Sequence, residues 1–199
     1  MTRRRFLFDT PDRFIAGTVG EPGNRTFFLQ ARDGTRIVSV ALEKVQVAAL
    51  ADRLTDLLDE LERRGIEGAD ADQPLDPNAG SLDEPINEAF RVGTLSMGWD
   101  TQDDLVLVEA RELVVEGEDE DDDEEAEEAE GAEEAFDDED EDGPDFIRVR
   151  LTALAARTFV VQAVRVLGSG RPPCPLCGQP LDPQGHLCPR RNGHGPLLN

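Results

Sequence analysis

Short runs of apolar and β-branched residues, each bounded by turn residues, fill the first 42 positions of the chain. Runs of this kind are typical of β-strands. They cover residues 5–8, 13–19, 26–31 and 35–42. Asp33 and Gly34 separate the last two runs, and this dipeptide predicts a tight hairpin with a type I′ turn. We therefore expect these four strands to form an antiparallel meander.

The hydrophobic period then changes from two to about 3.6 residues, which predicts an amphipathic helix over residues 43–64. Its apolar positions are Val47, Leu50, Ala51, Leu54, Leu57, Leu58 and Leu61. Charged residues fill the other side of this helix, and Gly65 supplies a stop signal. The apolar stripe is expected to pack on the sheet. The alternative is that it forms half of a dimer seam.

The second half of the chain predicts three more strands and one more helix. Residues 68–85 form a loop, residues 89–97 and 104–115 form strands around a turn at 98–103, and residues 146–151 form the last strand. Thr152 is the expected N-cap of a helix that runs to about Leu167. Gly168, Ser169 and Gly170 end that helix.

Charge is concentrated in one segment. Residues 116–145 contain 21 acidic residues and no basic ones, so only −3 of the formal charge of −24 belongs to the rest of the chain. Phe136 is the one aromatic residue of the segment, and like charges at this density repel each other. We expect a disordered insertion that acts as a solvated spacer. The alternatives are diffuse Ca²⁺ binding, mimicry of nucleic acid, or docking of a basic partner.

All three cysteines and both histidines lie in the last 26 residues: Cys174, Cys177, His186, Cys188 and His194. No stretch reaches the roughly 20 apolar residues that span a bilayer, and no signal peptide precedes the first strand. We therefore expect a cytoplasmic protein that does not enter the membrane. Thiols stay reduced in that compartment, which favours metal binding over disulfides.

The spacing of these residues predicts a zinc site, because tetrahedral Zn²⁺ takes four sulfur or nitrogen ligands. Cys174, Cys177 and Cys188 supply three of them. The fourth is His186 or His194, and we favour His186, because it forms a second short ligand pair with Cys188. Four ligands within reach indicate a closed structural site rather than a catalytic one. The competing interpretation is spare thiols and surface histidines.

Other chemistry is weakly indicated. We identify no catalytic residues and no cofactor other than structural Zn²⁺, so an enzymatic role stays open but is not favoured. The N-terminal Arg3, Arg4, Arg5 and Arg13 are a candidate anion-binding patch. Arg190 and Arg191 follow the zinc ligands and are candidate contacts to nucleic acid phosphates. For both groups, solvated surface charge is the simpler interpretation.

Three segments carry a resemblance to a known family. They are Phe6-Leu7-Phe8-Asp9 with Phe14, then Gly170-Arg171-Pro172-Pro173-Cys174-Pro175-Leu176-Cys177-Gly178, and Gly185-His186-Leu187-Cys188-Pro189-Arg190. This pattern resembles an uncharacterised actinobacterial domain-of-unknown-function family, over nearly the whole chain except the acidic segment. The resemblance implies genes that neighbour those of a phosphoglycerate-mutase-like phosphatase and a lipid-kinase-like protein. It carries no catalytic residue over to this chain.

Together these observations predict an α+β protein with an antiparallel sheet of about six or seven strands and two packed helices. Residues 1–115 and 146–168 form its domain, residues 116–145 are the acidic insertion, and residues 169–199 form a small zinc module. The expected function is a non-enzymatic interaction or regulatory role with a protein partner, in an oligomeric state that the sequence leaves open. The alternatives are association with nucleic acid, or action as an enzyme or accessory subunit beside a phosphatase-like or kinase-like partner.

Overall fold

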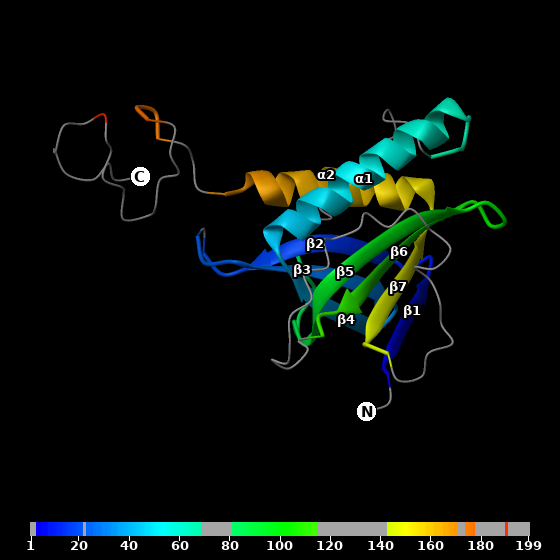
Figure 1. Ribbon diagram of the computed structural model, residues 1–199, viewed down its shortest axis with the longest axis horizontal. Helices are drawn as coiled ribbons and strands as arrows, with labels where there is room; N and C mark the ends of the chain where they lie inside the picture. Colours follow the sequence, from blue (N-terminus) through cyan, green and yellow to red (C-terminus); the bar gives the residue numbers. More distant parts are fainter. Residues whose placement is uncertain are drawn as a thin grey trace, which may run out of the picture.

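The computed structural model describes residues 3–21, 23–68, 81–114, 143–170, 174–177 and 190. Within these residues, a seven-stranded sheet carries two helices on one face (Figure 1). The elements are β1 (Arg5–Asp9), β2 (Arg13–Val19), β3 (Thr26–Asp33), β4 (Arg36–Leu42), α1 (Lys44–Arg63), β5 (Glu88–Asp100), β6 (Leu105–Glu112), β7 (Phe146–Leu151) and α2 (Ala153–Gly168). The predicted α+β class is confirmed, as is the approximate number of strands.

The prediction of a wholly antiparallel sheet is wrong. The strand order is β1-β7-β6-β5-β4-β3-β2, and the pairs β1–β7 and β4–β5 are parallel. Parallel neighbours need a crossover connection, and α1 lies in the connection between β4 and β5. The predicted four-stranded meander contains only three strands. β2, β3 and β4 pair in sequence, whereas β1 pairs with β7.

The sheet is strongly curled, and chain connectivity requires this shape. β1 and β2 are the two outermost strands, yet only residues 10–12 join them. In a flat sheet the six strand spacings between them would amount to roughly 29 Å. The linker, which crosses four peptide units, reaches at most about 15 Å. Arg36 at the start of β4 confirms the curl, because its Nη1 donates to the backbone oxygen of Leu7 in β1 at 2.9 Å.

The concave face of the sheet and the two helices enclose one hydrophobic core. Alternate residues of each strand point into it, and α1 contributes the apolar stripe that its sequence predicted. The α1 residues buried there are Val47, Leu50, Ala51, Leu54, Leu58 and Leu61. Phe14 of β2 stacks on Phe159 of α2 with ring centroids 4.9 Å apart. The stripe of α1 is therefore part of the core, as favoured over a dimer seam.

Most ends of helices and strands were predicted correctly from neighbouring residues in the sequence, but the type of one turn was predicted wrongly. Thr152 is the N-cap of α2, and its Oγ1 accepts the backbone N–H of Ala155 at 3.2 Å. The β3–β4 hairpin has Asp33 opposite Arg36, so its two loop residues are Gly34 and Thr35. Of these only Gly34 has a positive φ, at 56°. That geometry fits a type II′ turn and not the predicted type I′ turn.

The acidic segment interrupts the connection between β6 and β7, which are antiparallel neighbours. Residues 115–142 lie outside the described residues, so the predicted disorder stays a prediction. Asp145, which the sequence assigned to the insertion, belongs to the fold instead. It is buried, and its carboxylate accepts the backbone N–H of Arg4 at 2.6 Å and Nε–H of Arg4 at 2.5 Å.

On the convex face, residues 81–87 cross the β2–β3 hairpin. Leu82 sits directly on Gly17, where a Cβ would lie 2.5 Å from the Cγ of Leu82. The buried side chain of Gln30 makes two hydrogen bonds to the backbone of Asp83. Its Nε2 donates to the Asp83 oxygen at 2.9 Å, and its Oε1 accepts the Asp83 N–H at 2.7 Å. The connection is therefore fixed to the sheet by both packing and hydrogen bonds.

The convex face over β6 and β7 carries a buried carboxylate. The side chain of Glu109 is 0% exposed, and it accepts hydrogen bonds from Arg111 Nε at 2.6 Å and Arg148 Nε at 2.7 Å. Removing one partner of a buried ion pair leaves an uncompensated charge. Loss of either Arg111 or Arg148 would therefore destabilise the fold. This buried carboxylate could not be predicted from the sequence, because Glu109 follows a continuous apolar run.

Arg150 ties β7 to β1 and to the β5–β6 turn. Its guanidinium pairs with Asp9, Asp100 and Asp103. The pKa of Asp100 is held below its ordinary value, first by a hydrogen bond from the backbone N–H of Gln102. The backbone N–H of Asp103 and the side chain of Arg150 act in the same direction. The pKa of Arg150 is raised, chiefly by its hydrogen bond to Asp103 and also by Asp9 and Asp100. Both pKa shifts favour the charged forms of Asp100 and Arg150.

We predict that Gly17→Ala destabilises the fold by about 1–3 kcal/mol, because the new methyl group overlaps Leu82. Chemical denaturation of the full chain measures the change. In a Leu82→Ala background the same substitution should cost much less. Gly168→Ala is the matched control, since a Cβ there meets nothing within 4 Å, and it should be neutral or slightly stabilising. Equal losses at both glycines would contradict the packing described for Leu82.

Candidate functional site

The two described cysteines form a tight turn, here called the cysteine turn (residues 174–177). Residues 175–177 have turn geometry, and the Sγ of Cys174 accepts the backbone N–H of Leu176 at 3.4 Å. Cys174 is 2% exposed, whereas Leu176 between the cysteines is 45% exposed. A backbone N–H directed at sulfur favours the thiolate over the thiol, which is the form that binds metal.

The donor chemistry of the cysteine turn fits zinc. Two thiol groups three residues apart on one turn supply half of a tetrahedral set, and an N–H···S bond orients one of them. The other predicted donors, His186 and Cys188, lie outside the described residues, as does the alternative ligand His194. Within the described part of the chain no group of three His, Cys, Asp or Glu side chains could hold an ion. The four-residue site therefore stays a prediction.

The arginines predicted as one N-terminal patch lie at different places. Arg3 and Arg4 directly precede β1, and Arg5 begins it. Arg3 Nε donates to the backbone oxygen of Pro144 at 2.9 Å, and Arg4 pairs with Asp145. Arg13 begins β2, beyond the other end of β1. Its Nη1 donates to Oδ2 of Asp83 at 2.9 Å. The structure therefore does not bring these side chains together as an anion-binding patch.

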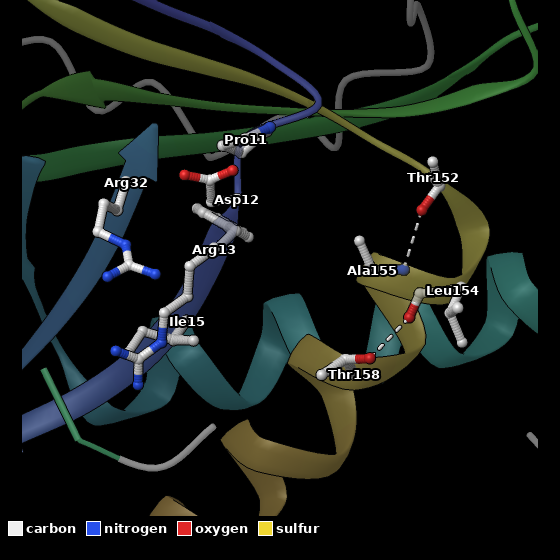
Figure 2. Close-up of a pocket in the computed structure, with 10 residues that line it drawn as sticks. Pro11, Asp12, Arg13, Ile15, Arg32, Thr152, Leu154, Ala155 and Thr158 are labelled. Atoms are coloured by element: carbon white, nitrogen blue, oxygen red, sulfur yellow. Dashed lines mark hydrogen bonds between the residues drawn. The ribbon is translucent and has the colours of Figure 1, made fainter. Parts of the chain in front are cut away.

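Arg13 belongs to a different site, and the sequence did not predict that site. An open groove of about 490 Å³, here called the arginine groove, lies between the start of β2 and the first two turns of α2 (Figure 2). Arg13 and Arg32 line one side, and Leu154, Ala155 and Thr158 line the other. Figure 2 shows the two guanidinium groups on the β-strand side of this space, with Leu154, Ala155 and Thr158 on the helix side.

The groove exists because of the curl and the strand register. Arg13 is directly opposite Arg32 in the β2–β3 pair, which places two like charges side by side. Asp83 offsets them, with its carboxylate oxygens 2.9 Å from Arg13 Nη1 and 3.6 Å from Arg32 Nη1. The sequence held only one usable signal, an arginine near each end of the hairpin. Their register depends on the length of the β2–β3 turn, which the pattern alone did not fix.

A family model described as "Protein of unknown function (DUF3090)" matches residues 6–188. The chain therefore belongs to the DUF3090 family, which confirms the expected membership of a domain-of-unknown-function family. Neither the curated proteins nor the solved structures gave a match. Among the described residues, neither α1 nor α2 meets the length and hydropathy that crossing a bilayer demands.

We predict that His186→Ala abolishes stoichiometric zinc binding and that His194→Ala leaves it intact, because His186 pairs with Cys188 at short spacing. Elemental mass spectrometry of the full chain, purified under reducing conditions, measures the metal. Cys174→Ser should also lose the ion and serves as the positive control. The reverse result for the two histidines would assign His194 as the fourth ligand. A wild-type chain without zinc would contradict the site itself.

Proposed function

We propose that the protein is a cytoplasmic, non-enzymatic interaction protein whose C-terminal segment is organised by a structural zinc ion. Cys174, Cys177, His186 and Cys188 would hold the ion. The observation that carries the proposal is the N–H···S bond at 3.4 Å inside the cysteine turn. A turn that directs a backbone amide at a buried sulfur is organised around that sulfur, as zinc-binding turns are.

Leu176 supports a contact role for the same turn. It stands between the two sulfur ligands and is 45% exposed, although leucine is usually buried. A zinc-bound turn would hold this side chain in one orientation, so that a partner could bury it at little cost in conformational entropy. The partner is expected to be a protein, because an aliphatic side chain binds to an apolar pocket and makes no specific contact with phosphates.

Association with nucleic acid is the second candidate. Arg190 is exposed, and it would need to act with its neighbour Arg191. Such binding weakens steeply with salt. The N-terminal arginines give it less support than the sequence suggested, since Arg4 and Arg13 are each held by a carboxylate of the fold.

We predict that Leu176→Ser keeps the zinc content of the wild type but loses the protein partner. Affinity capture with the full chain, with and without a chelator, identifies partners that depend on zinc, and the Leu176→Ser bait then tests the contact. Leu7→Ser is the matched control, because Leu7 is similarly exposed, at 50%, on β1. It should retain the partner.

Two results would contradict the proposal. A partner list that does not change on chelation would show that zinc does not organise the contact. Equal loss of the partner in both serine variants would show that the effect is not specific to the cysteine turn. Nuclease-sensitive capture that falls steeply between low and physiological salt would favour nucleic acid over a protein partner.

A further inference from the structure

The arginine groove places two positive charges side by side. Arg13 and Arg32 stand opposite each other on neighbouring strands, and both depend on the single carboxylate of Asp83. Asp12 is the other carboxylate at the groove, and its Oδ2 accepts the backbone N–H of Gly34 at 2.9 Å. Like charges directly opposite in a sheet are unfavourable, so a further anion near this pair would be stabilising.

Arg32 has a donor that nothing in the described residues satisfies. Its Nε is shielded from solvent and has no hydrogen-bond acceptor, and only the Nη1 end of the fork lies near Asp83. Arg13 is used more fully, since its Nη2 also donates to the backbone oxygen of Ser81 at 2.5 Å. A buried N–H without an acceptor is rare in folded proteins. The Nε itself is out of reach of a ligand, but the Arg32 side chain is 37% exposed and its contact with Asp83 is an ion pair at 3.6 Å, so the outer Nη groups of Arg32 are the donors available to a ligand oxygen.

The opposite wall is suited to the same charge. α2 begins at Ala153 and has no acidic residue in its first turn, so the positive end of its dipole is not offset by a side chain. Thr158 lines the groove as well, and its hydroxyl donates to the backbone oxygen of Leu154 at 2.9 Å. Figure 2 shows Thr152, Ala155 and Thr158 along the helix side, with Asp12 and Arg13 drawn between them and Arg32.

The size and the apolar lining of the groove indicate more than a bare ion. A volume of about 490 Å³ lies within the range of small-molecule sites. Ile15 and Ala155 contribute apolar surface, and Leu154 is 38% exposed at the rim. An organic ligand could thus place an anionic group against Arg32 and an apolar body of a few carbons against Leu154.

We propose that the arginine groove is a binding site for a small organic anion, whose phosphate or carboxylate group accepts hydrogen bonds from Arg32 and whose apolar part rests on Leu154. The site is built only from the sheet and α2. It does not depend on the zinc ion or on the contact proposed for the cysteine turn. A chain that lacks zinc binding would therefore still bind the anion.

Phenyl phosphate and benzoate, which share an apolar ring and differ in the anionic group, test the proposal by calorimetry on the full chain at physiological salt. At least one of them should bind, and Arg32→Gln should weaken that binding at least tenfold. Arg53→Gln is the matched control, since Arg53 is exposed on α1, and it should change the affinity less than twofold. The tighter of the two probes identifies the anionic group.

Further variants separate the parts of the site. Arg32→Lys keeps the charge but removes the fork, so it should also weaken binding, and it replaces Arg32→Gln as the test if thermal unfolding shows that variant to be unfolded. Leu154→Ser should weaken phenyl phosphate more than inorganic phosphate. The proposal is overturned if neither probe binds the wild type, or if Arg32→Gln and Arg53→Gln lower the affinity equally.

Discussion

The three residues between β1 and β2 impose the constraint on which the rest of this structure depends. They join strands at opposite edges of a seven-stranded sheet, so the sheet has to curl until its edges approach each other. Thr10 in this linker adopts a φ of 47°, which is unfavourable for a β-branched residue. The fold tolerates that local cost because closure lets one concave face and two helices share a single core. Arg36 then holds the closed edge by bridging β4 and β1, which would lie far apart in a flat sheet.

The same closure creates the arginine groove. The chain leaves β7 at Thr152 and enters α2 at the seam where β1 turns into β2. Thr10 donates its backbone N–H to Arg150 at 3.0 Å, which keeps the end of β7 beside that seam. The first turn of α2 is thereby placed opposite the start of β2. A flat sheet with the same residues would leave the helix N-terminus and the arginine pair without a common space.

Sequence reasoning was reliable where the signal is local and failed where it depends on pairing between distant segments. The stripe of α1, the Thr152 cap and the Gly34 hairpin follow from neighbouring residues, and each is found close to its predicted place. The strand order could not be predicted from neighbouring residues, because an alternating run such as β1 fits beside β7 as well as beside β2. The arginine groove was missed for the same reason, since the pairing of Arg13 with Arg32 requires the register. The cysteine cluster was visible because its spacing is local, although only Cys174 and Cys177 can be compared with the structure.

The fold also determines where the cysteine segment starts. Arg25, in the β2–β3 connection, donates from Nη2 to the backbone oxygen of Ser169 at 2.5 Å and from Nη1 to its Oγ at 3.1 Å. These bonds satisfy a carbonyl at the end of α2 and place a cation at the negative end of its dipole. The chain thus leaves the core from a fixed position only a few residues before Cys174. An anchored exit restricts the conformations available to Cys174 and Cys177, which would lower the entropic cost of assembling the proposed metal site there. The cysteine turn and the domain are therefore coupled through Arg25, whereas the arginine groove lies at the other end of α2.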